Sequence, residues 1–143
     1  MRILMLTPQI PYPPQQGTAL RNWGILRGLG SASGLGSPSG LGARHEVTLL
    51  TFAAPDQSME PDPPLEAATE QVVIVPQPTR TLKDRLLGMI TSKRPDLAMR
   101  LESDAFRQAM QYLLVRTKFD WILVQGLEMA PYLDLVWYQA DDP

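Results

Sequence analysis

Short apolar runs alternate with longer stretches in which apolar and polar residues are mixed. Unbroken apolar runs of this length are typical of strands that are buried on both faces of a parallel sheet. The segments predicted as strands are residues 2–7, 46–52, 71–75, 121–125 and 135–140. We therefore expect about five strands, each followed by a stretch long enough for a connection across the sheet.

Three of the intervening stretches carry apolar residues at helical spacing. These residues are Leu20, Trp23, Leu26 and Leu29 in the first, Leu82, Leu86, Met89 and Ile90 in the second, and Phe106, Ala109, Met110, Leu113 and Leu114 in the third. The second helix should end at Arg94, because a residue before proline disfavours the helical region. The third should begin at Ser103 or Asp104, since either side chain can cap free amides. This order predicts an α/β, Rossmann-like parallel sheet flanked by helices, in one domain over residues 1–143.

Two segments interrupt this pattern. Residues 31–42 are rich in glycine and serine and nearly repeat a six-residue unit. Such a composition loses too much backbone entropy to form a helix, so we interpret it as an inserted surface loop without a catalytic role. Residues 55–64 contain four prolines and three acids, which predicts a second exposed loop.

Composition narrows the class of protein. With 143 residues, 44% of them hydrophobic, the chain matches one ordinary globular domain, and two will not fit. A net charge of -2 gives no reason to expect a nucleic-acid partner. The chain contains no cysteine and only one histidine, His45. This composition excludes a disulfide framework and a His/Cys metal cage. No apolar run is long enough to cross a bilayer, so we expect a cytoplasmic protein.

Ligands of open parallel sheets gather beyond the carboxyl ends of the strands. The loop after the first predicted strand is stiffened by four prolines and leads to Gly17, where the chain turns into a helix. Free amides at that helix start suit a phosphate or a sugar hydroxyl, and Arg21 can pair with an anion. An ordinary helix start explains the same residues equally well. No GxGxxG or Walker motif is present, which argues against a dinucleotide site and a P-loop.

Several motifs occur together along the chain: RILMLT at 2–7, PYPP at 11–14, Gly17 and Arg21 with Leu26 and Leu29, RHEVTLLT at 44–51, FDWILV at 119–124 and EMAPYL at 128–133. Through these motifs the chain resembles the N-terminal domain of glycosyltransferase family 4 and its relatives in polysaccharide synthesis. The resemblance spans nearly all of the sequence, and its motifs are of moderate specificity.

The resemblance implies the N-terminal half of a GT-B fold, which binds the acceptor of a retaining glycosyltransferase. The donor is a nucleotide sugar, held mainly by a C-terminal domain, and neither a metal nor another cofactor is implied. Two Rossmann-like domains need roughly 300 residues, so we expect an incomplete enzyme that is inactive alone. Its expected partners are a glycan or lipid-linked acceptor and the missing donor-binding domain.

Site residues follow from the resemblance and from the loop positions. The substrate-binding candidates are Gly17, Thr18, Arg21, Gln125 and Asp142, and the weak catalytic candidates are Glu128 and Asp141. The family often has a second glycine at the position of Thr18. It often has a histidine or an acid at the position of Gln125, whose side-chain amide cannot act as a base.

Each candidate also has a structural explanation. Glu128 is equally an acid favoured by a helix dipole, and Asp141 and Asp142 are equally a solvated chain end. His45 begins the second strand, away from the ligand edge, and is expected to be structural.

Other readings stay open. One alternative is a stand-alone flavodoxin-like module that binds a ligand or partner without catalysis, and another is a nucleotide-binding regulatory domain. Residues 82–90, flanked by Lys83, Arg85, Lys93 and Arg94, suit peripheral contact with the inner face of a membrane, although packing on the sheet is the more frequent fate of such a stripe.

Overall fold

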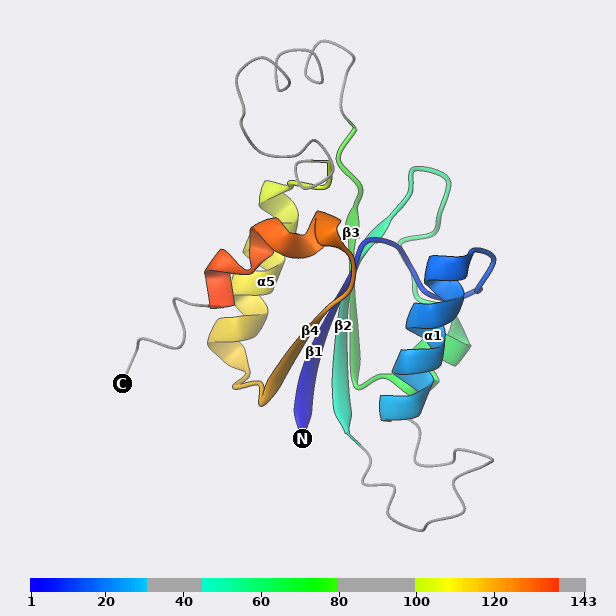
Figure 1. Cartoon of the computed structure of the whole chain (residues 1–143), viewed down its shortest axis with the longest axis horizontal. Helices are drawn as coiled ribbons and strands as arrows, with labels where there is room; N and C mark the ends of the chain where they lie inside the picture. The colour runs from blue at the N-terminus through cyan, green and yellow to red at the C-terminus, as the bar shows by residue number, and fades with distance from the viewer. Residues whose placement is uncertain (31–44, 80–99, 137–143) are drawn as a thin grey trace.

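The computed structural model describes residues 1–30, 45–79 and 100–136 (Figure 1). Its elements are β1 (Arg2–Thr7), α1 (Gly17–Gly30), β2 (Glu46–Ala53), α2 (Pro63–Ala68), β3 (Gln71–Pro76), α5 (Asp104–Arg116), β4 (Trp121–Val124) and the 3-10 helix η1 (Leu127–Tyr132). The predicted second helix at 82–90 and the predicted insertion at 31–42 lie outside the described residues.

The four described strands form one parallel sheet in the order β3-β2-β1-β4. The chain moves from β1 outward through β2 to β3 and then returns to the free side of β1. Strand order therefore reverses between β1 and β4, which is where open α/β sheets bind their ligands. The predicted α/β class and parallel sheet are confirmed.

The predicted strand count is wrong, because the described residues form four strands and not about five. Leu135 and Val136, the first residues of the predicted strand at 135–140, belong to a helical turn that follows η1. Both side chains are half-buried and pack against the core. An apolar pair looks the same in sequence whether it enters a strand or a helical turn.

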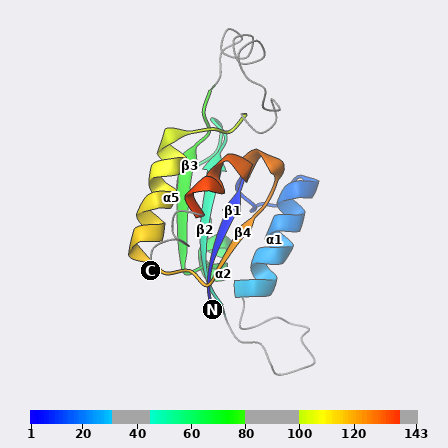
Figure 2. The same cartoon turned by 60° about the vertical axis from the view of Figure 1, so that its left-hand side comes forward.

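Helices cover both faces of the sheet and create two hydrophobic cores (Figure 2). On one face, Leu4 and Leu6 of β1 pack with Phe106 and Met110 of α5. On the other face, Ile3 and Met5 belong to the core that includes α1 and α2. Consecutive β1 residues point to opposite cores, which explains the unbroken apolar run that predicts this strand.

The helices differ from the prediction in detail. Helix α1 is confirmed, but Leu20 is 60% exposed and the buried positions include Ala19 and Leu26. The predicted threefold spacing drifts from the true 3.6-residue period, so the stripe was one residue out of phase at its start. Residues 55–62 form the expected exposed connection, but α2 begins at Pro63, where proline is tolerated in the first turn.

Helix α5 begins as predicted, with Ser103 as its N-cap. The Phe106 amide donates to Ser103 Oγ at 3.3 Å, which satisfies one of the free amides of the helix start. Phe106 then enters the core and stacks on Phe52 of β2, with ring centroids 4.3 Å apart. The cap therefore fixes both the start of α5 and the side that it turns towards the sheet.

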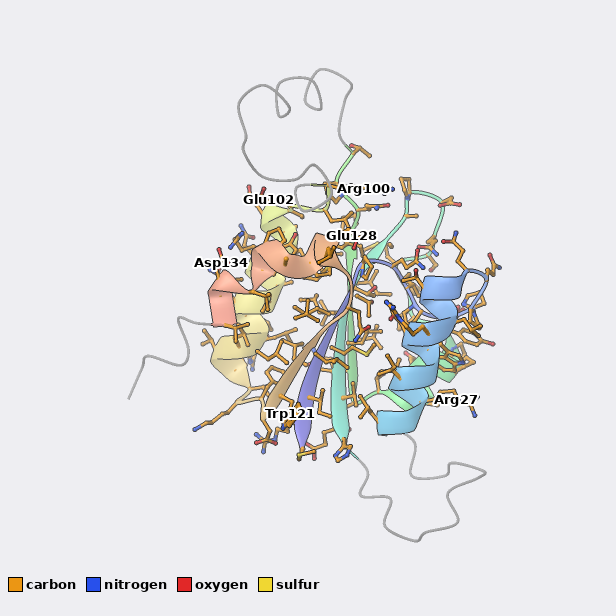
Figure 3. All side chains as sticks on the ribbon, viewed as in Figure 1. Arg27, Arg100, Glu102, Trp121, Glu128 and Asp134 are labelled. Carbon is orange, nitrogen blue, oxygen red and sulfur yellow. The ribbon has the colours of Figure 1, made fainter. Side chains whose placement is uncertain are left out.

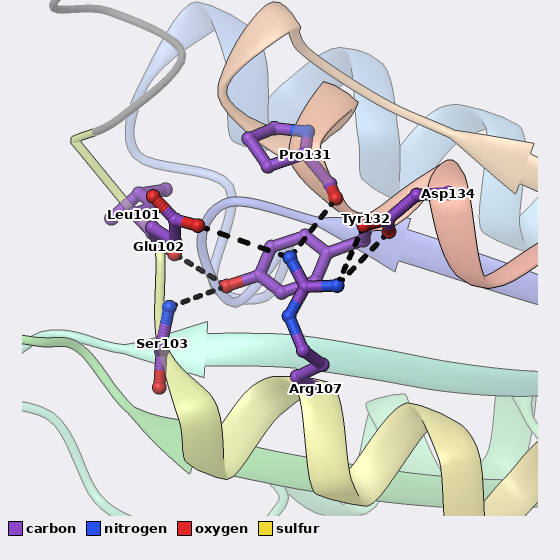
Figure 4. A network of polar contacts seen from close by, with 7 residues as sticks. All are labelled: Leu101, Glu102, Ser103, Arg107, Pro131, Tyr132 and Asp134. Carbon is purple, nitrogen blue, oxygen red and sulfur yellow. Dashed lines mark hydrogen bonds and ion pairs between the residues drawn. The ribbon is translucent and has the colours of Figure 1, made fainter. Parts of the chain in front are cut away.

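A polar cluster joins η1 to the start of α5 (Figure 4). The buried Tyr132 hydroxyl donates to the Leu101 carbonyl at 2.5 Å and accepts from the Ser103 amide at 2.9 Å. Arg107 lies over the Tyr132 ring, with its guanidinium carbon 5.6 Å from the centroid, and pairs with Asp134 at 2.9 Å. These contacts, which we call the Tyr132 clamp, hold the segment after β4 against α5.

One prediction concerns the Tyr132 clamp. Tyr132→Phe should lower the free energy of unfolding by about 1–3 kcal/mol, because it leaves the Ser103 amide and the Leu101 carbonyl without their partner. Tyr112→Phe is the matched control: Tyr112 is 55% exposed, and its change should stay within about 0.5 kcal/mol. Urea denaturation measures both values, and equal effects would contradict the clamp.

The clamp should also be sensitive to alkaline pH. Burial raises the pKa of Tyr132 from about 10 to about 12, against the opposing effect of the Ser103 hydrogen bond. Folding thus favours the neutral phenol. The stability that Tyr132 contributes in its neutral form is complete below pH 10 and is lost as the pH rises towards 12. The wild type should lose stability more steeply than Tyr132→Phe across that window, whereas parallel curves would contradict the assignment.

Asn22 is an anomaly of α1. Its side chain is fully buried, yet neither Nδ2 nor Oδ1 has a hydrogen-bond partner among the described residues. An unpaired buried amide costs about 1–3 kcal/mol. Asn22→Leu should therefore raise the free energy of unfolding by about 1 kcal/mol, measured by urea denaturation. A loss of similar size would mean that the amide has a partner outside the described residues.

Candidate functional site

The carboxyl ends of the parallel strands meet at one edge of the sheet, which lies at the top of Figure 1. The loop after β1 and the loop after β4 flank the point where strand order reverses. Because this position is the usual ligand crevice of open α/β sheets, these two loops form the candidate site.

The first loop is fixed where it leaves the sheet. A hydrogen bond of 2.8 Å joins the buried hydroxyls of Thr7 and Thr51, at the ends of β1 and β2, and Thr7 Oγ1 also contacts the Gln9 carbonyl at 3.0 Å. Further along, the Tyr12 ring packs on Trp23 of α1, with centroids 4.9 Å apart. The loop is thus held where it leaves β1 and again at Tyr12, before it reaches α1.

The start of α1 is open to solvent. Gly17, Thr18 and Arg21 are all exposed, and a Cβ atom added to Gly17 would meet no atom within 4 Å. Gly17 has no positive φ, so the expected sharp turn does not require glycine there. The first amides of α1 and the Arg21 side chain are therefore accessible to an anion or a hydroxyl-rich ligand.

The loop after β4 makes a sharper turn. The Gln125 amide donates to the Leu6 carbonyl at 3.0 Å, which extends the pairing between β4 and β1 by one residue. Gly126 then has φ 94°, the only positive φ among the described residues. This conformation strains any residue with a side chain, so Gly126 is required by the turn.

Gly126 also marks the contact between the two loops. A Cβ atom at Gly126 would lie 2.6 Å from Glu128 Oε2 and 3.5 Å from Pro8 Cγ. Pro8 and Glu128 therefore flank the same glycine, one from each loop. Gln125 and Glu128 lie near the end of β1, but within the described ranges no hydrogen bond or ion pair joins them to the predicted residues at the start of α1. Sequence reasoning missed Pro8 and Gly126.

The position of Glu128 is consistent with both a structural and a catalytic role. It is half-buried and stands in the first turn of η1, a position where acids are favoured. It also lies at the carboxyl edge of the sheet, far from Trp121 at the other end (Figure 3). Asp141 and Asp142, the remaining acids of the predicted site, lie outside the described residues.

The amino ends of the strands form the opposite edge. His45 lies there, directly before β2, and its backbone amide donates to the Leu29 carbonyl at 3.3 Å. A hollow of about 260 Å³ lies at the same edge; its lining residues include Arg2 and Glu46, which form an ion pair at 3.4 Å. His45 is thus far from the candidate loops, as expected.

Over the described ranges, no group of three or more histidine, cysteine, aspartate or glutamate side chains is arranged to hold a metal ion. In the same part of the chain, no helix combines the length and apolar character needed to cross a bilayer.

Compared with models of known protein families, with curated proteins and with solved structures, the chain matches none of them. The case for a function therefore rests on the chemistry of the two loops and of the α1 start.

Proposed function

We propose that the chain is the acceptor-side domain of a retaining GT-B glycosyltransferase of the family 4 type. In this proposal a sugar passes from a nucleotide-sugar donor to a glycan or lipid-linked acceptor. A second Rossmann-like domain, outside these residues, binds most of the donor. The observation that carries the proposal is the meeting of the β1 and β4 loops at Gly126, which Pro8 and Glu128 both approach, at the point where strand order reverses.

Each residue has a distinct role in the proposal. The amides at Gly17 and Thr18 and the Arg21 guanidinium hold acceptor hydroxyls or an acceptor phosphate, since the helix start favours negative charge. Gln125 orients the acceptor through its amide, which donates and accepts but does not titrate. Glu128 is the described carboxylate able to receive the proton of the attacking hydroxyl, and Asp141 and Asp142 remain candidates from sequence alone.

The chemistry explains why one domain is not enough. The bond between the anomeric carbon and the diphosphate oxygen breaks, a bond to the acceptor oxygen forms, and the hydroxyl proton leaves. Most of the barrier is lowered where the leaving diphosphate and the oxocarbenium-like sugar are stabilised by oriented amides and cations. In this proposal those groups belong to the donor-side domain, whereas this domain positions the acceptor.

The sheet order weakens the flavodoxin-like alternative. A flavodoxin-like order 2-1-3 would place β3 beside β1, whereas β1 here pairs with β2 and β4. The order 3-2-1-4 is that of the Rossmann type. Binding without catalysis remains an outcome of the experiments below, and so does a nucleotide-binding regulatory domain.

The first experiment separates these functions. The purified chain should transfer no sugar when nucleotide sugars are supplied with glycan or lipid-linked acceptors. Acceptor fragments should raise its melting temperature, because a ligand that binds only the folded state stabilises it. Nucleotide sugars and free nucleotides should leave the melting temperature unchanged. Transfer by the chain alone would contradict the proposal, and stabilisation by nucleotides alone would favour the regulatory domain.

The second experiment tests the open start of α1. Arg21→Ala should weaken binding of a phosphorylated acceptor fragment about fivefold to tenfold, or about 1–1.4 kcal/mol, the size expected for losing one hydrogen bond from a solvent-exposed side chain. Arg27→Ala is the matched control, because Arg27 is also exposed on α1 but lies in its last turn. Calorimetric titration measures both affinities. Equal effects would show that only net charge matters and would remove Arg21 from the site.

A further inference from the structure

The hollow at the amino edge of the sheet lies at the opposite end of the strands from the two candidate loops (Figure 1). Its volume of about 260 Å³ suits a ligand smaller than a typical drug. The described residues that line it come from β1, β2, the start of β3 and the chain that follows α5. None of them has a role in the function proposed above.

The lining residues of β1 and β2 share one face of the sheet. Leu4 of β1 and Leu50 of β2 belong to the core beneath α5. Because side chains alternate along a strand, Arg2, Glu46 and Thr48 point to that same face, closer to the amino edge. The polar floor of the hollow therefore continues the apolar core that α5 covers.

The end of α5 forms another side of the hollow. Thr117, the C-cap residue of α5, and the half-buried Phe119 both line it. The end of a helix carries a partial negative charge, because its last carbonyls lack partners within the helix. The hollow therefore lies in a negative potential that comes from the backbone of α5.

Thr48 brings an unsatisfied hydroxyl to the hollow. Its side chain lines the hollow and is only 7% exposed, yet its hydroxyl forms no hydrogen bond with another described residue. The buried hydroxyls of Thr7 and Thr51, in contrast, bond to each other at 2.8 Å. Because buried polar groups nearly always have a partner, the Thr48 hydroxyl indicates a place where a ligand completes the bonding.

The charges around Thr48 favour a cation. Among the lining residues, the positive charge of Arg2 is already paired with Glu46, with 3.4 Å between Nε and Oε2. Glu70 also lines the hollow, and it has no ion pair with another described residue. The Glu70 carboxylate and the end of α5 therefore remain to attract positive charge.

An ammonium group matches the polar atoms of the hollow. It has three N–H donors and no acceptor. The Thr48 hydroxyl, the Glu70 carboxylate and the side-chain carbonyl of Gln71 are acceptors that line the hollow. A carboxylate or phosphate ligand would instead meet two glutamates and a guanidinium that is already paired. The lining therefore selects a cation with N–H groups over an anion.

We propose that the hollow at the amino edge binds a small primary amine in its ammonium form. The ammonium group donates to the Thr48 hydroxyl and the Glu70 carboxylate, and the alkyl chain lies against Phe119. The proposal goes beyond the function proposed above and does not depend on it. Because the ligand is small and Glu70 is exposed, we expect a dissociation constant on the order of millimolar.

Titrations of the full chain, followed by backbone amide NMR shifts, test the ligand chemistry. Butylammonium should shift the amides of Thr48 and Gln71 and reach saturation. Tetramethylammonium has the charge without an N–H donor, and 1-butanol has no charge, so both should bind about tenfold more weakly. Equal binding of the three probes, tighter binding of butyrate, or no saturable shift would overturn the proposal.

Two variants test the residues. Thr48→Val and Glu70→Gln should each raise the dissociation constant of butylammonium about threefold to tenfold, because each removes one acceptor. Glu60→Gln is the matched control: Glu60 is exposed in the connection after β2, and its change removes the same charge without affecting binding. Equal effects of the two glutamine variants would show that only net charge matters and would overturn the site.

Urea denaturation separates binding from folding. Thr48→Val should not lower the urea midpoint, because the hydroxyl has no hydrogen bond with another described residue to lose. A lower midpoint would give the hydroxyl a structural partner and would overturn its role in binding.

A last titration distinguishes a free amine from a lysine side chain of a partner protein. N-acetyl-lysine methylamide carries the same ammonium group on a chain that ends in peptide groups. It should bind more weakly than butylammonium, because the hollow has the volume of a small molecule. Binding that is equally tight or tighter would assign the hollow to a lysine of a partner and would overturn the free amine.

Discussion

The fold depends on the pairing of β1 with a parallel neighbour on each side. From Ile3 to Thr7, every residue of β1 is buried. Its neighbour β2 is the next strand in the sequence, whereas its other neighbour β4 comes much later in the chain. Because parallel neighbours need crossover connections, the chain passes over one face with α1 and over the other with α5. The reversal of strand order at β1 then places the loops after β1 and β4 side by side. The contact between the two loops lies at Gly126, which Pro8 and Glu128 both approach.

The two cores and the Tyr132 clamp make this edge rigid. Phe106 stacks on Phe52 and brings α5 onto the sheet, and Tyr132 joins η1 to the start of α5. Glu128 lies within η1, so the same contacts fix its backbone. On the other side of β1, the Thr7–Thr51 hydrogen bond and the packing of Tyr12 on Trp23 fix the first loop. The open start of α1 therefore follows a loop whose position is determined by buried contacts.

The structural features that depend on local residue patterns can be predicted from the sequence. The four described strands and the capped start of α5 follow from apolar runs and from Ser103. The predicted phase of α1 is wrong at Leu20, because a threefold spacing drifts from the 3.6-residue period of a helix. The helical turn at Leu135 lies beside Asp134, whose contact with Arg107 joins residues 27 positions apart and is not visible in a local pattern. The approach of Pro8 to Gly126 is longer in range still, and no local pattern encodes it.

The most direct test of the account is a set of nuclear Overhauser effects in the isolated chain. Cross-peaks should join Pro8 and Gly126 protons, together with the parallel pattern that joins Leu4 to Ile122 and Leu6 to Val124. Cross-peaks of an antiparallel pair between these strands, or contacts that place Pro8 away from Gly126, would contradict it. The candidate site would then lose the meeting of loops on which its chemistry rests.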